Sequence, residues 1–255
     1  MMHIMQKKIL PNNKLSSMGP VYVINLEHRT DRRDYMINQL EKYGVKNYKI
    51  FPAYHGHNIK GEYEMSKGEI GCSMSHLLAI KDWYESEYES DYLIVMEDDL
   101  AFETVDHWDW DWEQFLNSIT FKYDLIHLAP SGVELEVPDD FRILKFNRDD
   151  IPIYFTTCYL ITKDGAREVL RKNTKNGKIK FDFNDRNNVA DWKIIYGAVQ
   201  NGYKIPLFAA NDSLGTDIEG HHEEKYSAFF HGVRRHTNEL LKNCKKPLSE
   251  ILTPN

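Results

Sequence analysis

The chain has 255 residues, of which 42% are hydrophobic and 28% are charged, proportions that are typical of a globular protein. Its 32 Lys and Arg against 39 Asp and Glu leave a formal net charge of −7, which argues against nucleic acid as the main partner. No run of about 18 apolar residues is present, so the sequence predicts no transmembrane segment.

The N-terminal segment and the cysteines bear on the cellular compartment of the protein. Residues 1–19 are polar and irregular and lack the apolar core of a secretory signal, so we predict a flexible arm there. The three cysteines, Cys72, Cys158 and Cys244, make neither a disulfide framework nor a CxxC zinc pair. We therefore expect a reducing, cytoplasmic location.

The first predicted elements alternate between strand and helix. VYVINL (21–26) is a short apolar run typical of a buried strand, and NYKIF (47–51) is a second one. Between them, HRTDRRDYMINQLEKYG (28–44) has apolar residues at helical spacing and ends on a glycine. This β-α-β order predicts a parallel sheet.

The next two elements lead to the most conspicuous acidic cluster. SKGEIGCSMSHLLAIKDWYESEYE (66–89) predicts a helix, since Ser66 and Glu69 have the spacing of a capping box. YLIVM (92–96) is the most apolar short strand in the chain, and it runs directly into three carboxylates.

The remaining elements continue the alternation. We predict strands at 123–128, 153–161 and 203–208, and helices near 164–172 and 190–201. Since no repeat or linker separates them, we expect one α/β domain over residues 20–224, with a mostly parallel sheet and helices on both faces. Residues 225–255 form a partly helical tail in this prediction.

The triplet Glu97-Asp98-Asp99 is the most informative feature. Adjacent carboxylates repel one another, and buried ones require partners or a cation. In an extended segment, residues two apart share a face, so Glu97 and Asp99 can converge on one ion while Asp98 points elsewhere. Oxygen ligands suit Mn²⁺ or Mg²⁺, and ligands gather at the carboxyl ends of strands in open α/β sheets. The alternative is a solvated acidic loop.

Basic residues and a lone aspartate are further candidates. Arg29, Arg32 and Arg33 follow the first strand, and guanidinium groups match phosphate oxygens. The alternative is an exposed first helical turn. Asp191 opens a predicted helix, where it is either a catalytic carboxylate or a partner of the helix N-terminus.

Three histidines are candidates of a weaker kind. His76 lies on the predicted helix at 66–89, where a surface or packed histidine is the alternative reading. His221 and His222 follow two acidic residues, and either one would add a metal ligand if the fold brought it to the triplet.

Several segments, taken together, resemble glycosyltransferase family 25, which includes bacterial lipooligosaccharide galactosyltransferases and the collagen galactosyltransferases. They occur in the family's order and cover most of residues 21–200. The segments are VYVINLEHRTDRRDYM, FPAYHG, GEIGCSMSHLLAIKDW, YLIVMEDDLAFE, TTCYLITKDGAREVL and VADW.

The resemblance implies a GT-A-type fold and transfer of a hexose from a UDP-sugar donor to an acceptor hydroxyl, with inversion at the anomeric carbon. The acidic triplet looks like the family's metal motif, which implies that Glu97 and Asp99 contact Mn²⁺ (or Mg²⁺) or the donor ribose. His221 or His222 would complete that metal site, and Asp191 aligns with the Asp of a PVD-like segment, here VAD, and would be the base.

The resemblance also implies a substrate-binding set. Part of it is the loop after the first strand, and part is a turn that reads AYHG here, so that His55 replaces the family's common Asp. The implied substrate-binding residues are Asn25, Leu26, Arg29, Arg32, Ala53, Tyr54, His76, Asp98 and Thr157.

Taken together with the acidic triplet, the resemblance implies an inverting, metal-assisted hexosyltransferase that uses UDP-galactose, with UDP-glucose as the alternative donor. Its acceptor is a glycan or a protein-linked hydroxyl. Two other classes stay open at this point. One is a divalent-metal enzyme of phosphate transfer, either a nucleotidyltransferase or a phosphohydrolase, and the other is a non-catalytic carbohydrate-binding module.

Overall fold

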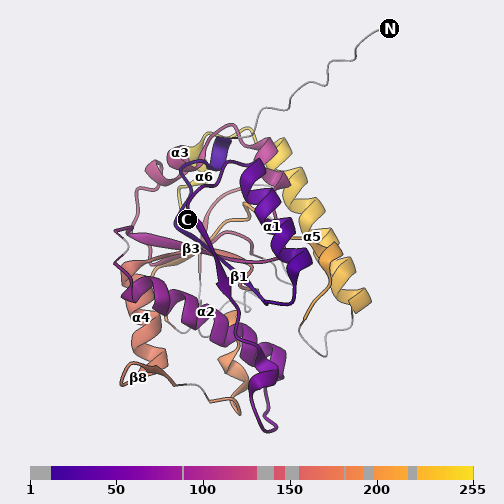
Figure 1. The fold of residues 1–255 in the computed structure, drawn as a ribbon. Coiled ribbons are helices and arrows are strands. Elements are labelled where there is room, and N and C mark those ends of the chain that lie inside the picture. The colour runs from indigo at the N-terminus through magenta and orange to yellow at the C-terminus, as the bar shows by residue number, and fades with distance from the viewer. Residues whose placement is uncertain are drawn as a thin grey trace.

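A computed structural model describes residues 13–87, 89–130, 141–146, 155–180, 182–191, 198–217 and 223–254, the first five residues of the last range as backbone only. Figure 1 shows a central sheet with helices packed on both of its faces.

Within the described residues, seven strands form the central sheet in the order β2-β1-β3-β7-β5-β10-β6. Strands β1, β2, β3, β5 and β10 run in one direction, while β7 and β6 run against their neighbours. The bounds are β1 Val21–Asn25, β2 Tyr48–Pro52, β3 Tyr92–Glu97, β5 Leu125–His127, β6 Leu144–Lys145, β7 Cys158–Thr162 and β10 Gly202–Lys204.

Two short antiparallel pairs flank this sheet. Strand β4 (Leu100–Ala101) pairs with β11 (Ala209–Ala210), and β8 (Thr174–Lys175) pairs with β9 (Lys178–Ile179). The first pair continues directly from the acidic triplet, so it ties the residues after the triplet to the chain at position 210.

The helices and helical turns connect the strands. The α-helices are α1 Thr30–Lys42, α2 Lys67–Glu85, α3 Trp112–Asn117, α4 Lys163–Asn173, α5 Glu223–Asn243 and α6 Leu248–Ile251. The short 3-10 turns are η1 Asn13–Leu15, η2 Gly56–Asn58, η3 Glu103–His107, η4 Arg186–Asn188 and η6 Asp212–Leu214.

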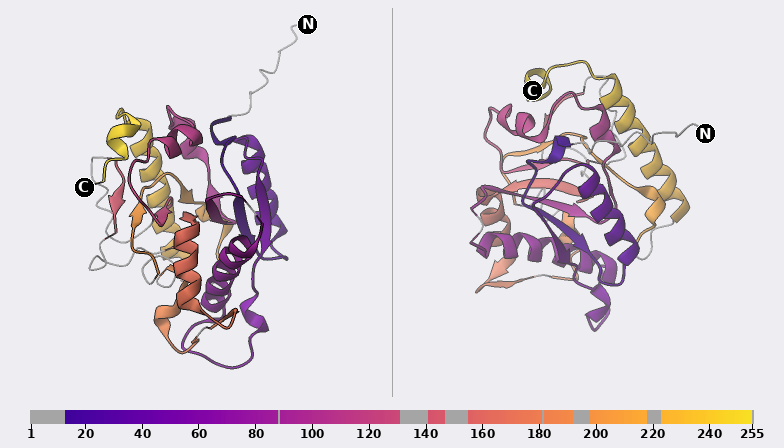
Figure 2. Two further views of the ribbon diagram at one scale, coloured as in Figure 1. Left: turned by 90° about the vertical axis from the view of Figure 1, so that its left-hand side faces the viewer. Right: turned by 45° about the horizontal axis from the view of Figure 1, so that its top comes forward.

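Successive side chains along each strand point to opposite faces of the sheet, so the core is divided into two layers. In β1, Val21 and Val23 face the layer that holds α1, α3 and α6, whereas Tyr22 and Ile24 face the layer that holds α2 and α4. Figure 2 shows α2 and α4 together on one side of the sheet. Both faces of the sheet are therefore covered, which explains why its strands are apolar throughout.

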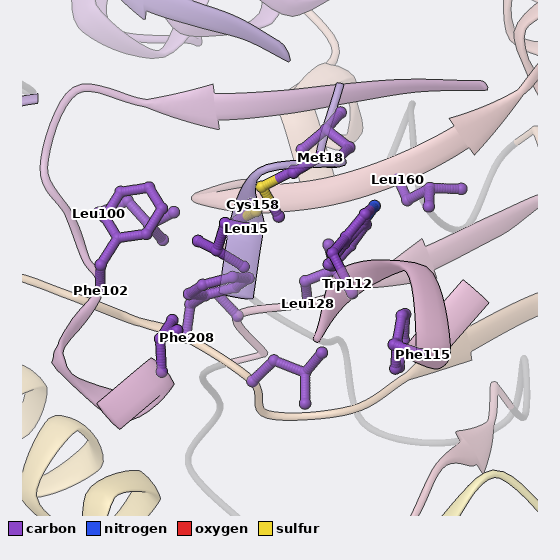
Figure 3. Close-up of a cluster of buried hydrophobic side chains, with 14 of the residues drawn as sticks. Leu15, Met18, Leu100, Phe102, Trp112, Phe115, Leu128, Cys158, Leu160 and Phe208 are labelled. Atoms are coloured by element: carbon purple, nitrogen blue, oxygen red, sulfur yellow. The ribbon is translucent and has the colours of Figure 1, made fainter. Parts of the chain in front are cut away.

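The first layer contains large aromatic side chains. Figure 3 shows Phe102, Trp112, Phe115 and Phe208 in this cluster, with Leu15 and Met18 beside them. Because Leu15 and Met18 are buried, residues 13–19 differ from the flexible arm predicted for residues 1–19.

The predicted fold class is confirmed, and local details differ. The strand expected at 123–128 is shorter, as is the one at 203–208, of which β10 retains Tyr203 and Lys204. Residues 198–201 form turns rather than the end of the helix predicted near 190–201, whose centre lies outside the described residues. The tail is helical in α5 and α6, and its Leu241 and Ile251 are buried in the first layer.

His127, at the end of β5, gives the fold a predicted acid sensitivity. The imidazole is fully buried, and burial, aided by the charge of Lys204, lowers its pKa to about 3 from 6.5. A depressed folded-state pKa means that this contribution to stability is present above pH 6.5 and is lost as the pH falls towards 3. We expect the free energy of unfolding to fall by about 1.4 kcal/mol per pH unit through that window.

Urea unfolding of wild type and His127→Gln between pH 7 and 4 measures this effect. The variant should lose less stability on acidification than wild type, because its amide does not titrate. His231→Gln, a change at a histidine side chain that is 68% exposed, is the control and should follow wild type. Equal pH slopes for wild type and His127→Gln would refute the assignment.

Candidate functional site

A cavity of about 410 Å³ opens where β1 and β3 end and the antiparallel β7 begins. The acidic triplet lies at this edge, with Glu97 as the last residue of β3 and the next two residues in a turn rather than in an extended segment. Eight of the sequence-predicted site residues line the cavity together: Leu26, Arg32, Ala53, Tyr54, His76, Glu97, Asp98 and Asp99.

Close packing of two glycines forms one wall of the cavity. A Cβ on Gly56 would lie 1.6 Å from the carbonyl oxygen of Lys67, and one on Gly71 would lie 2.8 Å from that of Tyr54. Only residues without a side chain allow the loop after β2 to approach α2 this closely. The capping box of Ser66 and Glu69, confirmed at the start of α2, sets where that helix begins.

Asp98 is held by two side chains from the first β-α unit. Arg32 Nη1 donates to its Oδ1 at 2.7 Å, and Asn25 Nδ2 donates to its Oδ2 at 2.7 Å. Both partners of the ion pair are less than 10% exposed. Burial raises the pKa of Asp98 despite the nearby Arg32 cation. Asp98 therefore joins β3 to α1 from inside the protein.

Glu97 faces a different set of residues, contributed by α2 and the chain before β7. Thr156 Oγ1 donates to its Oε1 at 2.7 Å, and His76 Nε2 lies 3.3 Å from the same oxygen. Burial raises the pKa of Glu97, but the hydrogen bonds and charge of His76 outweigh that effect, so the pKa is lowered. Glu97 is thus an ionised carboxylate on the cavity wall.

Asp99 is the carboxylate whose charge is least compensated. Its Oδ1 is buried and has no hydrogen-bond partner in the described part of the chain, while Oδ2 lies 3.5 Å from Arg32 Nη1. Burial and then the charge of Glu97 raise its pKa to about 7, against the effect of Arg32. A cation at Asp99 would offset this cost, since buried carboxylates require a counter-charge.

Residues 211–217, which are distant in the sequence, contact the acidic triplet and the arginines beside it. The Asn211 N–H donates to the carbonyl of Asp99 at 2.6 Å, and Arg32 Nη2 donates to the carbonyl of Gly215. Arg29 donates to Asp31, Asp217 and the Leu214 carbonyl. Arg29 and Arg32 are thus paired with acidic groups and carbonyls, which offsets the unfavourable position of these cations at a helix N-terminus.

Asp191 lies near this cavity without lining it. Its carboxylate accepts a hydrogen bond from the Phe155 N–H at 3.2 Å. The pKa of the Cys72 thiol is raised by burial, then by the charges of Glu97 and Asp191. Cys72 lines the cavity, so the effect of Asp191 on its pKa indicates that the Asp191 carboxylate lies near the cavity wall. Residues 192–197, which follow it, lie outside the described residues.

Other predicted residues have different positions. Neither Asn25, which donates a hydrogen bond to Asp98, nor Arg29 is among the residues that line the cavity. Thr157 is buried and contributes its carbonyl, which accepts the Glu97 N–H at 2.9 Å, so Thr156 rather than Thr157 supplies the side-chain contact. His221 and His222 lie outside the described residues.

Sequence reasoning missed three residues at this site. Thr156 binds Glu97, Cys72 lines the cavity, and Tyr159 contacts His76. Cys72 precedes His76 by four residues on a helix, a spacing that places both on one face, so this signal was present in the sequence. Nothing in the local sequence around Thr156 and Tyr159 indicated that they lie beside α2.

The fold and the site place this protein among the α/β proteins that bind ligands at the carboxyl ends of their strands. Here the cavity at that edge is lined by acidic residues and an arginine. The family model described as "Glycosyltransferase family 25 (LPS biosynthesis protein)" matches residues 18–184. The chain therefore belongs to glycosyltransferase family 25, and the predicted GT-A-type fold agrees with that membership and with the observed sheet.

Three relatives illustrate the match. "Procollagen lysyl hydroxylase and glycosyltransferase" of Acanthamoeba polyphaga mimivirus is 27% identical over an alignment of 188 residues that covers 63% of this chain and 20% of the relative. "Procollagen galactosyltransferase 1-A" of Xenopus laevis is 28% identical, over 60% of this chain and 28% of the relative. A "Glycosyltransferase 25 family member" of Anopheles gambiae is 31% identical, over 64% and 30%.

The chain matches only a fifth to a third of the length of these relatives. Among the described helices, none has both the length and the apolar character needed to cross a bilayer.

Proposed function

We propose that this protein is an inverting, metal-assisted hexosyltransferase that moves galactose, or alternatively glucose, from a UDP-sugar to a glycan or protein-linked hydroxyl. The observation that carries the proposal is the placement of Glu97 and the undercompensated Asp99 on one cavity of about 410 Å³ in a family 25 chain. The names of the family and of its procollagen galactosyltransferase relatives support the hexose and the acceptor class.

The residues present fit a hard divalent cation. Glu97 and Asp99 offer carboxylate oxygens, the ligands that Mn²⁺ and Mg²⁺ prefer, and the Asp99 Oδ1 is buried without a hydrogen-bond partner in the described residues. These two side chains would hold the ion. When bound, it would act as a Lewis acid that neutralises charge on the leaving UDP.

The chain's own residues would orient the donor. Leu26, Ala53 and Tyr54 form an adjacent part of the cavity wall, and the Ala53 N–H donates to the Asn25 carbonyl at 2.9 Å. That bond extends the pairing of β1 and β2 to the residues that would contact the nucleotide. Arg32 adds a positive charge beside the carboxylates, fixed in position by Asp98.

Asp191 is the proposed general base. An acceptor hydroxyl must lose a proton as it attacks the anomeric carbon, and a positioned carboxylate accelerates such a step about 10²–10⁴-fold. We therefore expect Asp191→Asn to reduce kcat by about that factor while leaving the Kd for UDP unchanged. The asparagine retains an oxygen that can accept the Phe155 N–H, so the fold is expected to persist.

Steady-state UDP release and calorimetric UDP binding measure these two effects separately. Asp164→Asn is the matched control, because this carboxylate side chain is 51% exposed on α4. Normal turnover of Asp191→Asn would place the base elsewhere.

A donor screen tests the function as a whole. UDP-galactose and UDP-glucose are each incubated with the protein, with and without Mn²⁺, with lipooligosaccharide and a hydroxylysine-containing collagen peptide as acceptors. We expect Mn²⁺-dependent release of UDP with one donor and glycosylated acceptor by mass spectrometry. Release of pyrophosphate or inorganic phosphate instead would indicate a phosphate-transfer enzyme, and binding without turnover would indicate a carbohydrate-binding module.

A further inference from the structure

Three side chains of different chemistry meet on the wall of the cavity. They are Cys72 and His76 from α2 and Glu97 from the end of β3. One ligand atom from each, a sulfur, a ring nitrogen and a carboxylate oxygen, lies within 4.8 Å of the other two. Cys72 and His76 are four residues apart on a helix, which places both side chains on one face.

The surroundings of His76 suit a metal ligand. Its ring is fully buried, with Nδ1 3.1 Å from the Tyr159 hydroxyl and Nε2 3.3 Å from Glu97 Oε1. A metal-bound histidine donates its other ring N–H to an acceptor, and a tyrosine hydroxyl can act as donor or acceptor. The Tyr159 hydroxyl can therefore accept the Nδ1–H of a metal-bound ring, while Nε2 faces the Glu97 carboxylate.

The distances between the ligand atoms and the ligand chemistry both favour Zn²⁺ over Mn²⁺ or Mg²⁺. Ligands at about 2.0–2.3 Å from a tetrahedral zinc ion lie about 3.3–3.8 Å from one another. The His76–Glu97 separation of 3.3 Å already has this value, and the Cys72 sulfur, which lies within 4.8 Å of the other two ligand atoms, would move closer when the ion binds. Sulfur and imidazole ligands favour Zn²⁺ over Mn²⁺ or Mg²⁺.

We propose that Cys72, His76 and Glu97 form a site for Zn²⁺, with the fourth coordination position open to the cavity. On binding, the thiol proton of Cys72 passes to solvent, and His76 binds through Nε2 as the neutral tautomer whose proton is on Nδ1, so any proton on Nε2 is also released to solvent. This site differs from the Mn²⁺ site proposed at Glu97 and Asp99 because two of its three ligands come from α2.

The shared residue predicts an inhibitory effect, a consequence that rests on the proposed function. Because Glu97 belongs to both sets, Zn²⁺ bound by Cys72 and His76 removes one carboxylate from the Mn²⁺ site. We expect Zn²⁺ to inhibit Mn²⁺-dependent UDP release at a fixed, subsaturating Mn²⁺ concentration, excess Mn²⁺ to relieve the inhibition, and Cys72→Ser to reduce it. The measured quantity is the ratio of rates with and without Zn²⁺ within each protein.

Cobalt spectroscopy tests the site without donor, acceptor or turnover. Co²⁺ replaces Zn²⁺ as a coloured probe and gives a thiolate-to-metal charge-transfer band only when a cysteine sulfur binds it. In the reduced 255-residue chain, we expect this band with one Co²⁺ per chain, its loss on addition of one equivalent of Zn²⁺, and its absence in Cys72→Ser. The Kd for Zn²⁺, from competition with a chromophoric chelator, should rise at least about 100-fold in Cys72→Ser.

Cys244→Ser is the matched control, because this half-buried cysteine lies near the end of the first-layer core and not on the cavity. It should retain the band and the Zn²⁺ affinity of wild type. Cys72→Ala is a second variant in case serine disturbs α2, with circular dichroism as the check on folding. Absence of the band in wild type, or its persistence in a folded Cys72 variant, would overturn the proposal, whatever the donor screen shows.

Discussion

Asp99→Asn is expected to lower Mn²⁺-dependent sugar transfer by about 10³-fold while making the protein more stable. The loss follows because an amide cannot hold the cation as a carboxylate does, and Lewis-acid stabilisation contributes several kcal/mol to such a step. The gain in stability follows because the Asp99 charge is poorly compensated, as its pKa of about 7 indicates.

The stability gain has a defined pH window. A folded-state pKa raised from 3.8 to about 7 means that wild type loses stability as Asp99 ionises, between about pH 4 and pH 7. The advantage of Asp99→Asn in the free energy of unfolding should therefore grow through that range and remain constant above it. Urea unfolding without added metal at pH 5 and pH 8 measures this difference.

The control for Asp99→Asn is Asp109→Asn, a change at an exposed carboxylate outside the cavity. This control should match wild type in Mn²⁺-dependent UDP release and in its stability at both pH values. Undiminished UDP release by Asp99→Asn, or a variant that is less stable than wild type at pH 8, would contradict the role assigned to Asp99.

Arg32→Met is expected to reduce the free energy of unfolding by about 3–5 kcal/mol, because it leaves the buried Asp98 carboxylate without its cation. Asn25 alone would then hold Asp98, with a single hydrogen bond of 2.7 Å. The side chains of Arg32 and Asp98 are only 7% and 8% exposed, so water does not replace the lost partner. Urea unfolding at pH 7.5 gives the difference.

Two further variants separate charge from packing. Arg33→Met changes the neighbouring, half-buried arginine and should alter stability by no more than about 0.5 kcal/mol. The double variant Arg32→Met, Asp98→Asn should recover part of the loss, because it also removes the unpaired charge. If Arg32→Met is as stable as Arg33→Met, the Asp98 ion pair does not hold β3 to α1.

The main elements of the fold could be predicted from the sequence because their signals are local. The apolar run at 92–96 became the buried strand β3, and the capping box at Ser66 set the start of α2. The parallel pairing of β1 with β2 followed from the β-α-β order. The reversal of β7 between β3 and β5 was not predicted, since strand order depends on long-range contacts.

The candidate site was predictable only in part, for a similar reason. Position after a buried strand placed Glu97, Asp98 and Asp99 at a sheet edge, where they lie. The different surroundings of the three carboxylates come from elements far apart in the chain: α1 supplies Arg32, α2 supplies His76, and the chain before β7 supplies Thr156.

The class of fold, the burial of the strands on both faces and the position of the acidic triplet all follow from local patterns in the chain, because periodicity and residue order act over short distances. Long-range packing, by contrast, pairs Asp98 with Arg32 inside the protein, leaves Asp99 with an undercompensated charge and brings Cys72 together with His76 beside Glu97. Those properties depend on desolvation and on distances between side chains, and both arise only when distant segments pack together.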